Sequence, residues 1–190
     1  MNVVGLSSLV AGAVALILVE RFYPRMALEL SFKADLKRET RWLAQYGQTS
    51  CTLAIAAVLW LMDRGPRPNG HYPALVLVVS VVAASVAAII LKRLLGRVRP
   101  RREGAGKFLG PSLKGGNSRE SFPSSHSAAA VAMSVVLARL YPPAAPVFWT
   151  LALICAGLRY VMDAHWPSDV LGGIALGYVA ADLVWRFMGT

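Results

Sequence analysis

The sequence predicts an all-α polytopic membrane protein in which six transmembrane helices form a bundle. Hydrophobic residues make up 56% of the 190 residues, and the mean hydropathy of +0.51 is too high for a typical soluble domain. Six runs with little or no charge each approach the ~20 residues that cross a bilayer as a helix. Since no internal repeat or second domain is visible, we expect a single membrane-embedded domain over residues 1–190.

Charged residues, prolines and turns bound the expected helices. The first run lacks the basic segment and the cleavage site of a signal peptide, so we interpret it as a retained helix. Pro100 is expected to end the third helix and Pro123 to begin the fourth, because proline suits only the first helical turn. In chain order, the helices are expected at about residues 3–19, 46–62, 73–98, 123–140, 144–162 and 167–187.

Residues 20–41 mix charges with apolar side chains at roughly helical spacing. This pattern predicts an amphipathic helix that lies in the membrane interface, with Trp42 and Tyr46 at the level of the headgroups. A solvated connector fits the same residues equally well.

The sixth helix carries a face of small residues, Gly173, Gly177 and Ala181. Small residues at this spacing allow the backbone of a second helix to come close. Asp182 and Arg186 are four residues apart on the same helix, and we expect them to form an ion pair near the membrane edge.

The net charge of +10 restricts the partners that we expect. On a membrane protein, such a charge points to anionic lipid headgroups or an anionic substrate, and nucleic acid is not an expected partner. The two cysteines, Cys51 and Cys155, lie in apolar runs and are interpreted as packing residues.

Residues 159–169, R-Y-V-M-D-A-H-W-P-S-D, place ionisable side chains between two apolar runs, where unpaired charge is costly. His165 and Asp169 stand at i, i+4 and can meet on one helix face. The carboxylate would then hold one ring nitrogen protonated and leave the other free as a nucleophile or base. Arg159 offers a planar fork that suits phosphate. The alternative is a polar interface loop with a chance histidine.

Two further segments favour the functional interpretation, because alternating helix direction brings them to the same membrane face. Lys92 and Arg99 are seven residues apart, and we expect them two turns apart on one helix face. Ser124, Ser125 and His126 begin the fourth helix, where free backbone amides and the positive helix end favour an anion.

This constellation fits phosphoryl transfer through a histidine. His165 can attack phosphorus while Asp169 orients its ring, and His126 can protonate the leaving oxygen and later take a proton from water. No carboxylate cluster or His/Cys set suits a metal, so we expect no metal and no other cofactor. The phosphate oxygens can be held by Lys92, Arg99, Arg159, Ser124 and Ser125.

The three segments resemble the signature of the type 2 phosphatidic acid phosphatase superfamily, in its integral-membrane lipid phosphatase branch. The first block of that signature is a lysine, six residues and Arg-Pro, which Lys92, Arg99 and Pro100 match. The second is usually P-S-G-H, and residues 123–126 read P-S-S-H, with Ser125 in the glycine position.

The third block is matched by Arg159, His165 and Asp169, with Leu158 in place of the usual serine. These two departures could alter phosphate contacts but leave the proposed chemistry intact. The resemblance implies phosphate binding by the matched lysine, arginine and serine positions. It makes His126 the acid and His165 a nucleophile that Asp169 assists.

A membrane lipid phosphatase is therefore the expected function, acting on a phosphomonoester or pyrophosphate of a phospholipid or prenyl lipid. Phosphatidic acid, phosphatidylglycerol phosphate, undecaprenyl pyrophosphate and lipid A phosphates all fit the resemblance. A lipid phosphotransferase would use the same residues, and a non-enzymatic lipid-binding or transport protein could keep a phosphate site.

Two observations disagree on the side of the membrane that carries the site. The face of the site holds 16 Lys and Arg residues and the opposite face 4, which the positive-inside rule would place in the cytoplasm. Bacterial members of the superfamily usually have the site on the periplasmic or exterior side, with both termini inside. Because part of the charge binds phosphate and headgroups, we expect a multi-pass protein of the inner membrane with an extracytoplasmic site.

Overall fold

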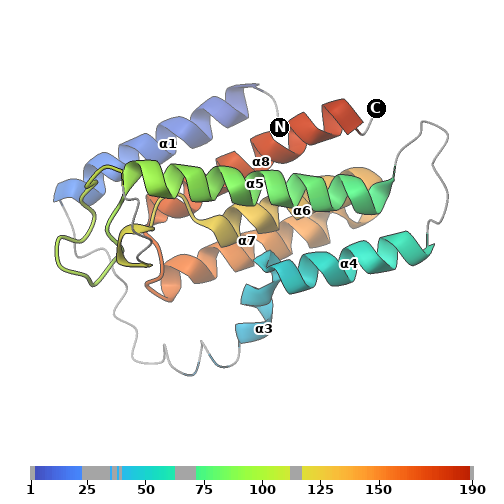
Figure 1. Cartoon of the computed structure of the whole chain (residues 1–190), viewed down its shortest axis with the longest axis horizontal. Helices are drawn as coiled ribbons and strands as arrows, with labels where there is room; N and C mark the ends of the chain where they lie inside the picture. The colour runs from blue at the N-terminus through green and yellow to red at the C-terminus, as the bar shows by residue number, and fades with distance from the viewer. Residues whose placement is uncertain are drawn as a thin grey trace.

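The computed structural model describes residues 3–22, 35, 38, 40–62, 72–111 and 117–188, and all regular secondary structure in these ranges is helical. Figure 1 shows the long helices running side by side along the long axis of the molecule. The α-helices are α1 (Val3–Phe22), α3 (Arg41–Ala44), α4 (Thr49–Met62), α5 (Pro73–Leu95), α6 (Ser125–Leu140), α7 (Ala145–Val161) and α8 (Pro167–Met188). Three 3₁₀ turns, η1 (Gln45–Gly47), η2 (Asn117–Arg119) and η3 (Pro142–Ala144), complete the order.

Six long helices lie where charge-free runs predicted them, but their lengths differ. Within the described residues, four segments are long and apolar enough to cross a membrane: Val4–Phe22, Pro73–Leu95, Pro142–Val161 and Pro167–Met188. Helices α4 and α6 are apolar but have 14 and 16 residues. The protein is thus an all-helical protein with four candidate membrane spans.

Helix α5 ends three residues before the expected position, at Leu95 rather than Val98. Gly96 adopts the left-handed conformation with φ of 58°, and its amide donates to the Lys92 carbonyl at 2.9 Å, as in a glycine C-cap. A Cβ at Gly96 would lie 2.0 Å from the Gly110 carbonyl oxygen, so no larger residue fits. Arg99 therefore lies beyond the helix, and the prediction that Lys92 and Arg99 share one helix face is wrong.

The chain after Gly96 folds back on itself. Arg97 and Phe108 form an isolated antiparallel bridge, and the amide of Val98 donates to the Lys107 carbonyl at 2.9 Å. This short hairpin holds Arg97 and Val98 against the helix ends.

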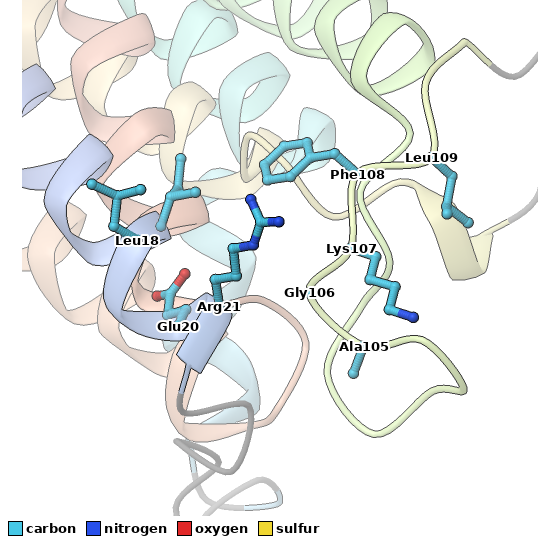
Figure 2. A pocket seen from close by; sticks show the side chains of 9 residues that line it. Leu18, Glu20, Arg21, Ala105, Gly106, Lys107, Phe108 and Leu109 are labelled. Carbon is cyan, nitrogen blue, oxygen red and sulfur yellow. The ribbon is translucent and has the colours of Figure 1, made fainter.

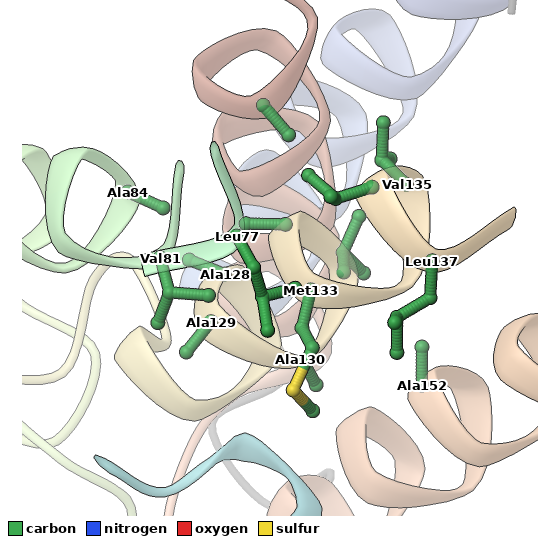
Figure 3. Packing of buried hydrophobic residues seen from close by; sticks show 14 of the residues in the cluster. Leu77, Val81, Ala84, Ala128, Ala129, Ala130, Met133, Val135, Leu137 and Ala152 are labelled. Atoms are coloured by element: carbon green, nitrogen blue, oxygen red, sulfur yellow. The ribbon is translucent and has the colours of Figure 1, made fainter. Parts of the chain in front are cut away.

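Helix α6 lies at the centre of the bundle, between α5, α7 and α8 (Figure 1). Eleven of its residues, 127–137, are buried. Figure 3 shows the packing, in which Leu77 and Val81 of α5 meet the alanines and Met133 of α6, with Ala152 of α7 on the other side. Small side chains on α6 let three neighbours approach it at once, so the core is built around this helix.

The predicted small-residue face of α8 makes its close contact with α6. A Cβ at Gly173 would lie 2.5 Å from the carbonyl oxygen of Ser124, and one at Gly177 would lie 2.2 Å from that of Ala128. Both distances are far below ordinary van der Waals contact, so only glycine fits these two positions. Asp182 and Arg186 also form the expected ion pair, at 2.9 Å.

The segment predicted as an interfacial helix is only partly described. Helix α1 continues to Phe22, so Glu20 belongs to that helix and not to the following segment. Residues 23–34, 36, 37 and 39 lie outside the described residues, and the amphipathic helix therefore stays a prediction. Trp42 is exposed, but Tyr46 is 8% exposed and its hydroxyl lies 2.9 Å from that of Ser134. Tyr46 is a core residue and not a headgroup anchor.

Candidate active site

The predicted site residues gather at one end of the bundle, where the last turns of α1, α5 and α7 meet the first turns of α6 and α8 (Figure 1). The amide of Ser124 donates to the carbonyl of Asp169 at 2.9 Å, which ties the start of α6 to the start of α8. Within the described residues, the expectation that these helix ends share one face of the protein is confirmed.

His165 lies in the turn between α7 and α8 and is 1% exposed. Its Nδ1 is 2.9 Å from the carbonyl oxygen of Ser121. Because a carbonyl can only accept a hydrogen bond, Nδ1 carries the proton and Nε2 keeps its lone pair. Burial lowers the pKa of His165 to about 4, against the raising effect of Asp169. The ring is therefore neutral at neutral pH, with one nitrogen ready to act as a nucleophile.

Asp169 is fully buried in the first turn of α8 and accepts hydrogen bonds from several donors at once. Oδ2 accepts the Trp166 amide at 2.9 Å, as in the capping of a helix N-terminus. Oδ1 accepts Nη1 of Arg97 at 2.6 Å, and the hydroxyl of Ser121 also donates to Oδ2. This carboxylate is therefore held in place by three separate segments of the chain.

The predicted contact between His165 and Asp169 is longer and less direct than expected. Nδ1 of His165 lies 3.7 Å from Oδ2 of Asp169, against 2.9 Å from the Ser121 carbonyl. The two residues do not share a helix face, because α8 begins at Pro167 and His165 precedes it. Asp169 acts on the ring by charge and through Ser121, whose carbonyl accepts the hydrogen bond of the ring N–H and whose hydroxyl donates to the carboxylate.

The start of α6 supplies the second group of predicted residues. Ser124 is the N-cap, and its hydroxyl oxygen accepts the amide of Ser127 at 3.4 Å and the hydroxyl of Ser127 at 2.9 Å. Ser125 and His126 follow in the first turn and are half-buried. Pro123 precedes the cap and does not open the helix, so the expected start is two residues early.

Three cations surround these histidines. Arg159 of α7 and Lys92 of α5 act electrostatically on His126, as do Arg99 and His165. Nη1 and Nη2 of Arg99 donate to the carbonyls of Ala164 and Glu120, at 3.0 and 3.3 Å. The Nε atoms of Arg99 and Arg159 are buried and have no partner among the described residues, so both guanidinium groups keep donors for an anion.

Four residues of the site were not predicted: Glu20, Arg97, Ser121 and Trp166. Arg97 is 1% exposed and connects Asp169 with Glu20 of α1, and Trp166 donates from its indole Nε1 to the Val98 carbonyl at 3.1 Å. The one signal in the sequence was a carboxylate at the end of the first apolar run, which gave no indication of its partner 77 residues away.

The described residues contain no group of three or more His, Cys, Asp or Glu side chains that could hold a metal ion. A neutral imidazole with a free nitrogen, a second imidazole and three cations around one space can bind a phosphate group, attack its phosphorus and protonate the oxygen that leaves.

Comparison with known proteins agrees with this geometry. The family model described as the PAP2 superfamily matches residues 73–190. A lipid A 1-phosphatase of Rhizobium johnstonii is 36% identical over 99 residues, 52% of this chain and 41% of that protein. The putative undecaprenyl-diphosphatase YbjG of Escherichia coli is 25% identical over 141 residues, 71% of this chain and 67% of that protein.

Two solved structures share the fold. LpxE of Aquifex aeolicus matches with a TM-score of 0.64 and 18% identity, over 80% of this chain and 86% of that one. A transmembrane PAP2-type phosphatidylglycerolphosphate phosphatase of Bacillus subtilis matches with a TM-score of 0.61 and 20% identity, over 98% and 87%. The chain spans less than half of the length of the Rhizobium relative. With a family match over more than half of its residues, the chain belongs to the PAP2 superfamily.

Proposed function

We propose that this protein is a membrane lipid phosphatase that works through a phosphohistidine on His165 and needs no metal or other cofactor. The observation that carries the proposal is the buried, neutral ring of His165, whose Nδ1 proton is fixed on the Ser121 carbonyl, 2.9 Å away. Such an imidazole in a cluster of cations suits attack on phosphorus better than it suits packing alone.

In the first step, Nε2 of His165 attacks phosphorus, and the bond from phosphorus to the lipid oxygen breaks. His126, which burial and the nearby cations keep neutral in the empty site, takes up a proton as the anionic phosphate binds and gives it to that leaving oxygen. In the second step, a water molecule attacks the phosphohistidine and loses a proton to His126, and the bond from phosphorus to nitrogen breaks. Inorganic phosphate leaves, and both histidines return to their starting forms.

The transferred group brings negative charge that the site must stabilise throughout. Lys92, Arg99 and Arg159 are assigned to its oxygens, together with Ser124 and Ser125 at the start of α6. The unpartnered Nε atoms of the two arginines support this assignment. Asp169 balances the charge that develops on the His165 ring.

The same proposal places all 190 residues in one membrane-embedded domain. Helices α4 and α6 would then join the four candidate spans to give six membrane crossings, and residues 20–41 would form a helix in the interface. The protein would lie in the inner membrane with its site on the extracytoplasmic side, and it would not bind nucleic acid. Lipid chains would stay in the bilayer while the phosphate enters the site.

The substrate is proposed to be a phosphomonoester or pyrophosphate of a phospholipid or prenyl lipid. The names of the relatives support this range, because one is a lipid A 1-phosphatase and another a putative undecaprenyl-diphosphatase. Phosphatidic acid, phosphatidylglycerol phosphate, undecaprenyl pyrophosphate and lipid A belong in the first panel of compounds.

The test is phosphate release from that panel by the purified full-length chain with EDTA present. We expect release from one lipid class, and loss of release in His165→Ala. A His165→Ala variant with full turnover would contradict the mechanism, and dependence on an added divalent cation would contradict the metal-free proposal. Transfer to an added acceptor lipid without release of phosphate would identify a phosphotransferase. Phosphate binding with no turnover would identify a binding or transport protein.

A further inference from the structure

Helix α1 lies outside the segment that the family model matches, yet it reaches the candidate active site through one side chain. Glu20 is 1% exposed, whereas its neighbours Arg21 and Phe22 are exposed. Its Oε1 accepts the amide of Ser168 at 3.0 Å, and its Oε2 accepts the hydroxyl of the same residue. A carboxylate from α1 therefore satisfies a first-turn amide of α8, which is the task of a capping residue.

Arg97 connects this carboxylate with the catalytic one. Its Nη2 donates to Oε2 of Glu20 at 2.7 Å, and its Nη1 donates to Oδ1 of Asp169 at 2.6 Å. Nη1 also lies 2.5 Å from the hydroxyl of Ser168. The guanidinium stands over the rings of Phe108 and Trp166, with 5.0 and 5.5 Å to their centroids, so two aromatic contacts add to its hydrogen bonds.

Buried charges at this end of the bundle depend on one another. Two carboxylates and one guanidinium, each no more than 1% exposed, meet at the positive N-terminus of α8. Removing Glu20 would leave Arg97 with only Asp169 as a charged partner, and removing Arg97 would leave two buried carboxylates without a cation. A buried group that loses its partner relaxes by moving or by taking up water, and Arg97 passes such a change to Asp169 through their 2.6 Å contact.

Glu20 does not belong to the phosphate cluster. Figure 2 shows it beside a cavity of about 550 Å³ between the end of α1 and residues 105–109, together with Arg21 and Phe108. Lys92, Arg99 and Arg159 do not line this cavity, and no hydrogen bond joins them to Glu20 among the described residues. Among the described residues, Glu20 therefore reaches the reaction through Arg97, Ser168 and Asp169.

We propose that Glu20 and Arg97 are positioning residues of the active site, which fix the carboxylate of Asp169 and, through it and Ser121, set the charge and orientation of the His165 ring. The kinetic test of this inference rests on the proposed function, whereas its NMR test rests on the structure alone. Helix α1 is thereby part of the catalytic unit, and not only a membrane anchor.

The sign of the charge effect separates positioning from simple support of the fold. The ionisable groups that act on His165 are Asp169 from α8, Lys92 from α5 and Arg99 from the loop after α5, and His126 of α6 is coupled to it as well. Beyond Asp169 stand Arg97 and Glu20. Taking away the cation Arg97 favours the charged ring and moves its titration upward in pH, whereas taking away the anion Glu20 moves it downward.

Loss of structure would act differently. Loosening the helix ends would hydrate the ring and move its titration toward the ordinary histidine value of ~6.5 in both variants. Opposite directions in Glu20→Gln and Arg97→Gln are thus a result that a purely structural role does not give. For unit charges at this range we expect shifts of about half a pH unit or more.

The experiment follows the histidine ring by ¹⁵N NMR in the purified full-length chain. Only three histidines occur in the sequence, and a His165→Asn variant assigns the signal without any need for turnover. We expect the His165 titration to rise in Arg97→Gln and not to rise in Glu20→Gln. Upward movement in both variants, or movement in neither, would overturn the inference.

Kinetics supply the rate readout, with the lipid phosphate that wild-type protein hydrolyses. Glu20→Gln is expected to lower kcat by about 10- to 100-fold, in line with a displaced orienting group, while KM and inhibition by orthovanadate change less than about threefold. Arg97→Lys keeps the charge but loses the second hydrogen bond, so its kcat should fall without a shift of the titration. If Arg97→Gln does not fold, Arg97→Lys takes its place in the kinetic comparison only.

The matched control is Asp182→Asn, which breaks ion pairs to Arg139 and Arg186 at the far end of the same helix. We expect it to change stability but neither kcat nor the His165 titration. A loss of kcat in this control equal to that of Glu20→Gln would assign the effect to stability of α8 and refute positioning. Absence of phosphate release in wild type would refute the proposed function instead, and the NMR result would still decide the inference.

Discussion

Replacing Gly173 by alanine tests whether the contact between α6 and α8 sets the position of the catalytic groups. The added Cβ would lie 2.5 Å from the carbonyl oxygen of Ser124 and 2.9 Å from the Cβ of Ser127. Ordinary contacts of this kind begin near 3.4 Å, so the helices must separate by about 1 Å at this level. Overpacking of a core by one methyl group costs about 1–3 kcal/mol.

The displaced backbone belongs to the site itself. Ser124 caps α6, and its carbonyl accepts the amide of Ala128 at 3.0 Å. Its shift carries His126 away from the other catalytic groups, and a misplacement of about 1 Å can lower a rate by about 100-fold. We expect Gly173→Ala to lower both the melting temperature and kcat.

Gly177→Ala gives a graded comparison, because its Cβ would lie 2.2 Å from the Ala128 carbonyl, one turn farther from the site. It should destabilise the protein at least as much but reduce kcat less. Gly157→Ala is the control, since a Cβ at Gly157 meets nothing within 4 Å. Thermal unfolding and phosphate release measure the four proteins side by side. Wild-type stability and kcat in Gly173→Ala would refute the reasoning from close helix contact.

Three other predictions concern charge and topology. Because burial lowers the pKa of His165 to about 4, its protonation opposes folding between pH ~6.5 and 4. As the pH falls over this window, wild type should lose up to about 1.4 kcal/mol of unfolding free energy per pH unit relative to His165→Asn. Chemical unfolding at several pH values measures this difference. An equal dependence of unfolding free energy on pH in the two proteins would contradict a buried neutral ring. Arg159→Lys should raise KM and weaken inhibition by orthovanadate about 10-fold or more through loss of the guanidinium fork, whereas Arg139→Lys outside the site should leave both unchanged. In a cysteine-free background, Glu103→Cys should react with an impermeant thiol reagent in intact cells and Pro143→Cys only after lysis; the reverse pattern would place the site in the cytoplasm.

Sequence reasoning named the candidate site residues but not the geometry that brings them together. Spacing alone placed Lys92 and Arg99 on one helix, but Gly96 ends α5 between them and puts Arg99 in a loop. Likewise, His165 and Asp169 have helical spacing, but Pro167 starts α8 after the histidine. In both cases tertiary packing brings the two residues near each other. Helical spacing does not explain it, because neither pair lies within one helix.

Other features lie beyond any local pattern. Glu20 and Arg97 are 77 residues apart, and the pairing of a buried carboxylate with a distant guanidinium has no periodic signal in a sequence. Tyr46 looked like an interfacial aromatic because it adjoins an apolar run, yet its hydroxyl finds a buried partner in Ser134. By contrast, the small-residue face with Gly173 and Gly177 was predictable. A backbone that packs this close admits only glycine, so the contact is visible in the sequence as small residues at a fixed spacing.

Two helix N-termini face the site. The groups that already cap them determine which of the two can accept an additional anion. At α8, the carboxylates of Glu20 and Asp169 already accept the amides of Ser168 and Trp166, so an additional anion there would meet two negative charges. At α6, only the neutral hydroxyl of Ser124 caps the helix, and the amides of the next two residues have no acceptor among the described residues. The positive end of α6 is thus left without an anion of its own. Under the proposed function, the transferred phosphate would be the anion that completes it, with the phosphorus between the start of α6 and the ring of His165.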